Sequence, residues 1–111
     1  MYKVRFYEED NGRKPIQEFI NSAQKSLREK INRQIMHLEE FGITYLNPYL
    51  KKLSGTQLWE VRILGKDSTR IICVAIVKRE ILVIHIFKKK TNKTSPKDLK
   101  ISMERYKKLD K

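Results

Sequence analysis

Apolar and polar residues alternate at the start of the chain, over residues 2–8, with Val4 and Phe6 on one side. A period of two predicts a β-strand. The pattern then changes to helical spacing, first from Pro15 and again over residues 26–41. The apolar stripe predicted for the second helix comprises Leu27, Ile31, Ile35, Leu38 and Phe41. Two consecutive helices with a short connection are expected to form a hairpin.

The second half of the chain contains three runs rich in Ile and Val, which predict three strands. The runs are Leu58–Leu64, Thr69–Lys78 and Ile81–Lys89. Their connectors are short enough for hairpins, so the strands are expected to pair antiparallel. The segment before them, residues 43–57, is predicted to be an irregular loop. Four apolar side chains are expected to attach this loop to the core: Tyr45, Leu46, Leu50 and Leu53.

A last helix is predicted from Ser95 onward, because Ser95 is a good N-cap and Pro96 fits the first helical position. The element order is therefore β-α-α-β-β-β-α. This order predicts one α+β domain over residues 1–111, with a mainly antiparallel sheet flanked by helices. Alternation in the first of the three runs is expected to direct Trp59, Val61 and Ile63 into the core.

Charge is the compositional feature that bears most on function. The 25 Lys and Arg residues outnumber the 13 Asp and Glu residues, which gives a net charge of +12. The excess is one-sided: residues 1–50 carry 8 basic and 7 acidic side chains, whereas residues 51–111 carry 17 basic and 6 acidic ones. Such a field attracts polyanions, so RNA, DNA or an acidic partner protein are the candidate ligands.

Other classes of protein are excluded by the residues themselves. A single cysteine, Cys73, stands in an apolar run, which indicates a buried core residue and no disulfide framework. His37 and His85 have no metal-ligand pattern around them, so neither a metal nor a cofactor is expected. No apolar stretch approaches the ~18 residues of a membrane span. The first residues lack the apolar region of a signal peptide, so we expect a cytoplasmic protein.

The candidate chemistry lies in cations on the predicted strands. Alternation places Glu60 and Arg62 on the face opposite Trp59. If the next turn is a three-residue loop, Arg62 lies directly opposite Arg70 on the following strand. Two like charges repel there, and a bound anion would relieve the repulsion, because Arg binds phosphate oxygens through two nitrogens. Glu60 could instead be a structural counter-ion of the two arginines.

Further lysines are expected to gather around this pair. The third strand ends in a lysine run, and either Lys88 or Lys89 should reach the arginines, depending on the register. Lys51 and Lys52 approach from the preceding loop. The alternative for residues 88–90 is that they only solvate a sheet edge and protect it from aggregation.

A longer pattern extends through the second half of the chain. It comprises Leu53-Ser54-Gly55, Leu58-Trp59-Glu60-Val61-Arg62-Ile63, Arg70-Ile71, His85-Ile86-Phe87-Lys88-Lys89-Lys90-Thr91-Asn92-Lys93-Thr94 and Pro96. This pattern resembles the signature of RelE/HigB-type toxins, and in particular their phage-derived host-inhibition branch. The resemblance covers roughly residues 2–105 in the same element order. The one departure is Ser95, which is inserted between Thr94 and Pro96.

The resemblance implies the toxin of a type II toxin–antitoxin pair. Such a toxin cleaves mRNA on the translating ribosome without a metal, and a helix-turn-helix antitoxin of the HigA type silences it. Operator DNA would be reached only through the antitoxin. The motif positions imply Arg62, Arg70, Lys89 and Lys90 as functional cations. The candidate RNA-binding residues are Lys51, Lys52, Lys88, Lys90 and Lys93.

Metal-free RNA cleavage uses the 2′-hydroxyl as nucleophile on the adjacent phosphate, and it needs charge stabilisation, a base and an acid. Arg62 and Arg70 can stabilise the charge. Glu60 is a possible base, weakened by a neighbouring Arg that favours its ionised form. Lys89, at the strand end, is a possible acid. His85 is a reserve candidate for either role, although a histidine in an apolar strand is more often a satisfied core residue.

Two other functions remain open at the level of the sequence. The same basic face could belong to a non-catalytic module that binds RNA or the ribosome. A DNA-binding regulator is less favoured, because the cations cluster on strands and no helix with base-reading residues is evident.

Overall fold

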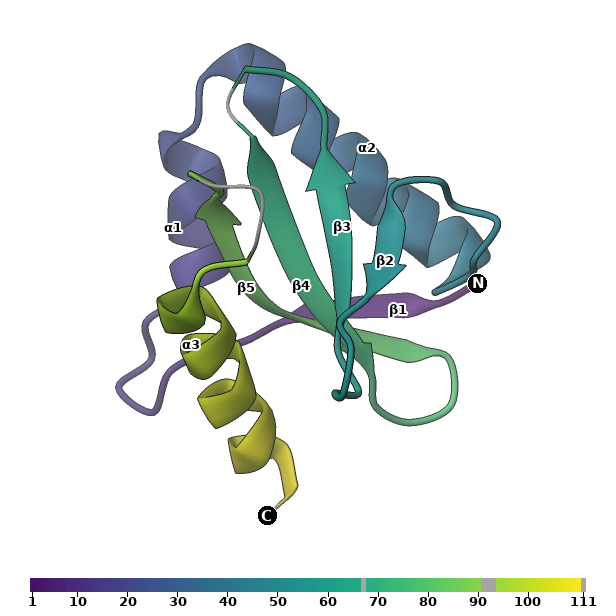
Figure 1. Ribbon diagram of the computed structural model, residues 1–111, viewed down its shortest axis with the longest axis vertical. Coiled ribbons are helices and arrows are strands. Elements are labelled where there is room, and N and C mark those ends of the chain that lie inside the picture. The colour runs from purple at the N-terminus through teal and green to yellow at the C-terminus, as the bar shows by residue number, and fades with distance from the viewer. Residues whose placement is uncertain (67, 91–93, 111) are drawn as a thin grey trace.

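The computed structural model describes residues 1–66, 68–90 and 94–110. In chain order the elements are β1 (Lys3–Phe6), α1 (Pro15–Ser22), α2 (Lys25–Phe41), β2 (Leu50–Lys52), β3 (Trp59–Ile63), β4 (Thr69–Ala75), β5 (Glu80–Lys88), α3 (Pro96–Lys107) and a 3₁₀ turn at Lys108–Asp110. The strands form one sheet in the order β1-β5-β4-β3-β2 (Figure 1). Only the β1–β5 pair is parallel among the described strands. The predicted α+β fold with a mainly antiparallel sheet is confirmed.

The helices lie on both faces of the sheet. One face packs against α1 and α2 through a cluster that includes Ile31, Leu38, Val61 and Ile71. The other face carries a smaller cluster beneath α3, which includes Ile72, Leu82 and Ile84, with Met103 and Tyr106 packed against it from the α3 side. Figure 1 shows that α3 crosses the β5 side of the sheet, away from β2. Part of this second face is therefore left uncovered.

Helix α2 follows the predicted stripe except at its last position. Leu27, Ile31, Ile35 and Leu38 are buried. Phe41 was expected in the stripe but is 53% exposed, because the helix ends there and its ring packs on His37 of the same helix. Gly42 ends the helix with φ 74°, and a Cβ at this position would lie 2.5 Å from the Tyr2 ring, so only glycine fits.

The segment 43–57 differs most from the prediction. Residues Leu50–Lys52 form strand β2, which pairs antiparallel with β3 at the sheet edge. Tyr45 and Leu46 are not core residues, since they are 89% and 80% exposed. Leu50 and Leu53 pack against the two core clusters, as predicted. Asn47 also anchors the chain, as a buried polar residue whose Oδ1 accepts from the Tyr49 N–H at 3.0 Å. A three-residue strand between turns carries too short a pattern to reveal its period.

Strand β3 has the predicted two-sided character. Val61 and Ile63 are buried, Trp59 is partly buried at the edge of the same cluster, and Arg62 is exposed on the other face. The predicted register is also confirmed: Arg62 lies opposite Arg70 in the β3–β4 ladder. Helix α3 begins as predicted, because the Ser95 hydroxyl accepts from the Asp98 N–H at 3.1 Å.

Within the described residues, no helix is both long and apolar enough to span a bilayer. Cys73 is fully buried, and this burial raises the pKa of its thiol to about 12. It is the small core residue that the sequence predicts.

Candidate functional site

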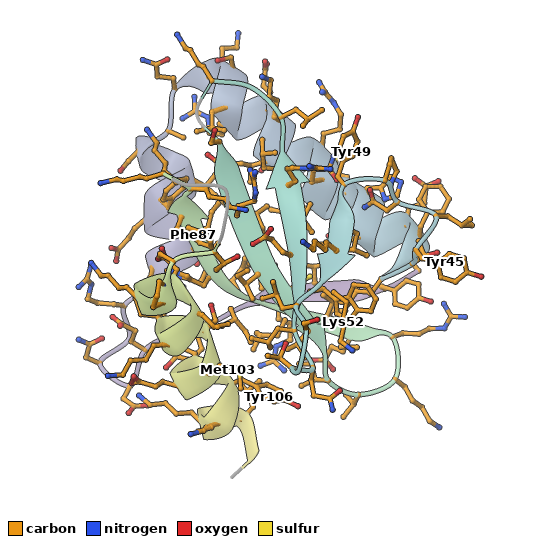
Figure 2. The ribbon with its side chains drawn as sticks, viewed as in Figure 1. Tyr45, Tyr49, Lys52, Phe87, Met103 and Tyr106 are labelled. Atoms are coloured by element: carbon orange, nitrogen blue, oxygen red, sulfur yellow. The ribbon has the colours of Figure 1, made fainter. Side chains whose placement is uncertain are left out.

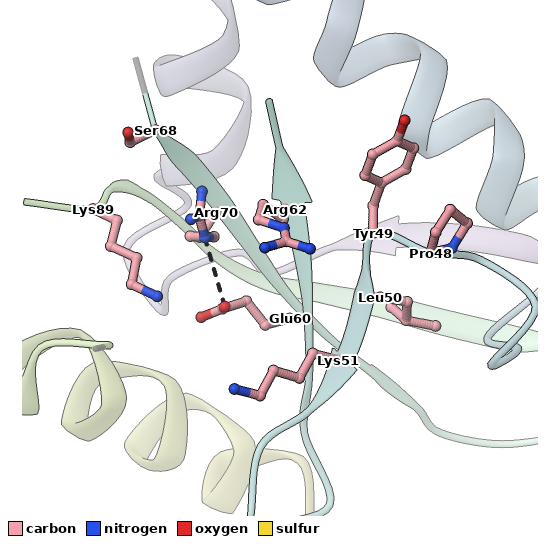
Figure 3. Close-up of a pocket in the computed structure, with 9 residues that line it drawn as sticks. All are labelled: Pro48, Tyr49, Leu50, Lys51, Glu60, Arg62, Ser68, Arg70 and Lys89. Atoms are coloured by element: carbon pink, nitrogen blue, oxygen red, sulfur yellow. Dashed lines mark ion pairs between the residues drawn. The ribbon is translucent and has the colours of Figure 1, made fainter. Parts of the chain in front are cut away.

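A pocket of about 330 Å³ lies on the uncovered part of the sheet face that carries α3. Its lining residues come from β2, β3, β4 and the segments next to them (Figure 3): Pro48, Tyr49, Leu50, Lys51, Glu60, Arg62, Ser68, Arg70 and Lys89. Five of the sequence candidates meet here, namely Lys51, Glu60, Arg62, Arg70 and Lys89. Four are cations and one is a carboxylate, so the pocket favours an anion.

The two arginines differ in their surroundings. Arg62 is exposed, and its guanidinium makes no hydrogen bond or ion pair with the described residues. The Arg70 side chain is only 13% exposed, with Nη1 donating to the Thr69 carbonyl at 3.0 Å. Directly opposed like charges destabilise a sheet. An anion between the two guanidiniums would remove this repulsion, and Arg62 is available to bind one.

Glu60 is the buried counter-charge of the pocket. Its Oε1 lies 3.6 Å from Arg70 Nε, and its Oε2 accepts from the Thr94 hydroxyl at 2.7 Å. Arg70 Nε is itself buried and has no hydrogen-bond partner among the described residues. The carboxylate therefore holds Arg70 by charge through Oε1, and it accepts a hydrogen bond through Oε2. This arrangement favours the structural role that the sequence left open for Glu60.

The lysines enter from opposite sides. Lys51 lies opposite Glu60 in the β2–β3 ladder, and the Lys89 N–H donates to the Ser68 carbonyl at 2.8 Å beyond the end of β5. Figure 3 shows both side chains extending toward the space in front of Glu60. The register question between Lys88 and Lys89 is thus decided by alternation: Phe87 faces the α3 side, so Lys88 points to the other face and Lys89 returns to the pocket.

The remaining lysine candidates lie elsewhere. Lys52 Nζ sits 5.5 Å from the Trp59 ring centroid, and Lys88 lines a cavity formed with α1 and α2. Lys90 lines a neighbouring cavity with Lys89 and the start of α3. Lys93 lies outside the described residues. Lys52, Lys88 and Lys90 do not line the pocket with the arginines. For Lys52 and Lys88 the reason is that neighbouring residues of a strand point to opposite faces.

His85 does not line the pocket either. His85 pairs with Ile72 and shares the α3 face with Phe87, where its ring lies against Asp98 and Arg105 of α3. Its Nε2 lies 2.8 Å from Asp98 Oδ1, and Arg105 Nη1 lies 3.3 Å from its Nδ1. Since Arg can only donate, the proton is on Nε2 and is donated to Asp98. Both ring nitrogens are satisfied within the protein.

The electrostatics of His85 agree with this hydrogen bonding. Burial lowers its pKa below the ordinary value, and the Arg105 charge adds to this effect, while Asp98 opposes it. His85 is therefore neutral near pH 7, and it connects β5 to the N-terminus of α3. Ser95 completes the connection by donating to the other oxygen of Asp98.

Three residues near the arginines were not singled out from the sequence. Thr94 holds Glu60, Ser68 lines the pocket at φ 47°, and Tyr49 joins the pocket from the residue before β2. Thr94 belongs to the quoted pattern, and this membership was the available indication. Tyr49 stands two positions before Lys51, but no period was evident in so short a segment. Among the described residues, no His, Cys, Asp and Glu side chains gather in a group that could hold a metal ion.

Comparison with known proteins places this geometry in a family. Residues 18–107 match the family model described as Phage derived protein Gp49-like (DUF891). The structure is similar to that of a mutant of the E. coli toxin RelE in the free state, with a TM-score of 0.61 and 17% sequence identity over 97% of both chains. No curated protein matches the chain in sequence. The family match extends over most of the chain, so the chain belongs to the Gp49-like family of phage-derived proteins, and it has the RelE-type toxin fold.

Proposed function

We propose that this protein is the toxin of a type II toxin–antitoxin pair and that it cleaves mRNA on the ribosome without a metal. The observation that carries the proposal is the Arg62–Arg70 pair, held opposite each other in an open pocket with Lys51 and Lys89. Cleavage by the 2′-hydroxyl builds negative charge on the scissile phosphate, and positioned cations stabilise that charge most where it develops.

Each residue has a distinct part in this scheme. Arg62 binds the phosphate from the exposed side, and Arg70 supports it from below while Glu60 keeps Arg70 in place. Lys89 is the candidate that protonates the leaving 5′-oxygen, and Lys51 adds charge at the other rim. Glu60 could accept the 2′-hydroxyl proton only after releasing Thr94 or Arg70. His85 has no part in this scheme, because both of its nitrogens are engaged outside the pocket.

The scheme makes the ribosome necessary. Strong attraction to RNA does not align a 2′-hydroxyl with its phosphate, and such alignment can lower a barrier by roughly 7–11 kcal/mol. A ribosome that holds the message in a fixed path supplies this alignment. The proposal includes a helix-turn-helix antitoxin of the HigA type as the silencing partner, contact with operator DNA only through that antitoxin, and action in the cytoplasm.

The test compares cleavage of one mRNA, free and in a stalled translation complex, at matched salt concentration. We expect efficient, position-specific cuts only in the complex. Equal rates in both would remove the ribosome from the mechanism and would indicate a self-sufficient ribonuclease.

A second candidate function is favoured by one observation. The Glu60 carboxylate is buried, its Oε2 accepts from Thr94 and its Oε1 faces Arg70, so it is poorly placed to act as a base. A non-catalytic module that binds RNA or the ribosome would not need a base. Induced expression separates the two functions. The toxin arrests growth and leaves cut mRNA, whereas a binding module gives no cuts.

A further inference from the structure

A second cavity adjoins the pocket and shares Arg62 and Tyr49 with it. It lies between α2 and the end of β3 and measures about 370 Å³. Its other lining residues are Lys30, Arg33, Gln34, Ile63, Leu64 and Gly65. This volume is within the range of small-ligand sites, roughly 300–1,000 Å³. A chain lying across Arg62 could therefore occupy both spaces at once.

The lining combines the groups that bind a nucleotide. Lys30 and Arg33 supply positive charge from α2, and Lys30 Nζ is held beside the β3–β4 turn by donating to the Leu64 carbonyl at 3.1 Å. Ile63 and Leu64 add apolar surface. Figure 3 shows the Tyr49 ring directed toward α2, where a base could stack against it. Aromatic rings bind bases of single-stranded RNA in this way.

Gln34 provides an independent indication that a ligand binds here. Its Oε1 is buried and has no hydrogen-bond partner among the described residues. Buried polar atoms are nearly always satisfied, so each exception calls for an explanation. The oxygen is covered in this conformation, so a ligand N–H or O–H group, such as a base edge or a ribose, would satisfy it once the Gln34 amide turns into the cavity that it lines. An amide side chain also offers a donor beside its acceptor, which suits the edge of a base.

We propose that this cavity binds one nucleotide of the RNA next to the scissile phosphate and that Gln34 contributes to the base preference. Tyr49 stacks on the base, Gln34 contacts its edge or the ribose, and Lys30 and Arg33 bind the outer phosphate. The proposal rests on the proposed function, since it takes Arg62 as the point where the two spaces meet.

The test measures binding, so that it does not depend on cleavage. Short fluorescent RNAs carry a single 2′-deoxy nucleotide at the cut position, which prevents reaction, and vary in one base on either side of it. We expect the wild-type protein to discriminate among the four bases on one side by roughly 5- to 100-fold, the range of a good pair of hydrogen bonds to a base. Gln34→Leu should reduce this ratio to near one.

Gln17→Leu is the matched control. Gln17 also has a buried Oε1 without a partner, but it lies on α1 and lines none of the cavities described above. The control should keep the wild-type ratio. A second pair of variants tests the phosphate contact: Arg33→Ala should lower the salt slope of binding by about 0.7, as expected for one lost contact to a single strand, and Lys25→Ala should not.

The outcomes separate this proposal from the proposed function. Base discrimination that is absent in the wild type, or that survives Gln34→Leu unchanged, overturns the subsite even if mRNA is cut on ribosomes. Discrimination that Gln34→Leu abolishes supports the subsite even if no cut is found. Equal salt slopes for Arg33→Ala and Lys25→Ala overturn the phosphate contact.

Discussion

The two faces of the sheet are built for different purposes. The face toward α1 and α2 is mainly apolar, and it includes Val61, Ile71 and Val83 from three adjacent strands. The opposite face is apolar beneath α3, where Phe87 and Met103 lie (Figure 2). Across β2, β3 and β4 it changes to Lys51, Glu60, Arg62 and Arg70 (Figure 3). The same strands supply both surfaces, because their side chains alternate.

The face that carries the pocket contributes less to stability than the face toward α1 and α2. On the face toward α1 and α2, most inward positions of the described strands bury apolar side chains. On the face that carries the pocket, Arg62 and Arg70 lie opposite each other, and the buried carboxylate of Glu60 offsets part of their charge. Like charges opposite each other weaken a sheet. Such a pair is best explained by an anion that the protein binds.

Substitutions on the face toward α1 and α2 should lower the stability of the protein and leave its cleavage activity unchanged. Ile71 is 1% exposed within the larger cluster, so Ile71→Ala should lower the free energy of unfolding by about 2–5 kcal/mol. Urea unfolding measures this loss. Activity per folded molecule should stay at the wild-type level, and a specific loss of cleavage would contradict the separation of the two faces.

On the face that carries the pocket, substitution of Arg62 should lower cleavage without destabilising the protein. Removing one positioned donor to a developing charge typically costs about 100- to 1,000-fold in rate, so Arg62→Ala should reduce cleavage on ribosomes by that factor. Its melting temperature should not fall, because Arg62 is exposed and the described residues give its guanidinium no partner. A small rise is expected instead, since the substitution relieves the repulsion between Arg62 and Arg70. Lys78→Ala removes the same charge from the exposed β4–β5 connection and should leave the rate unaltered.

Substitution of Arg70 should lower both the stability of the protein and its cleavage activity. Arg70→Ala leaves the buried Glu60 carboxylate without its ion partner, which should cost about 1–3 kcal/mol in stability in addition to the loss of cleavage. Adding Glu60→Gln should restore part of the stability and none of the cleavage. If the double variant were no more stable than the single one, Glu60 would not be the counter-ion of Arg70.

The smallest effect is expected at the connection between β5 and α3. The pKa of His85 is lowered in the folded protein, so the folded state binds fewer protons than the unfolded state as the pH falls below the ordinary histidine value of 6.5. This contribution to stability is complete above pH 6.5 and is lost as the pH falls through the folded pKa. Urea unfolding between pH 5 and 8 should therefore show a steeper decline for the wild type than for His85→Gln. Parallel curves would show that His85 is not buried in its neutral form.

Local spacing determined much of this protein from the sequence. A period of two determines the faces of β3, and the length of the β3–β4 turn determines that Arg62 lies opposite Arg70. The Ser95 cap of α3 depended likewise on neighbours within four residues. Such features follow from the sequence because the interacting residues are close along the chain or are related by one short turn.

Only the tertiary structure decided the rest, because those features depend on contacts between distant segments. β2 is a strand because β3 offers it hydrogen bonds, although its three residues carry no pattern of their own. Glu60 faces Arg70 as its counter-ion and is held there by a hydrogen bond from Thr94, 34 residues further along the chain. Tyr45 is exposed because the loop turns outward, and His85 lies outside the pocket because Asp98 and Arg105 of α3 engage its ring. A hydrophobicity pattern predicts which side of a helix or strand is apolar. Which residues that side contacts depends on segments that are distant in the sequence.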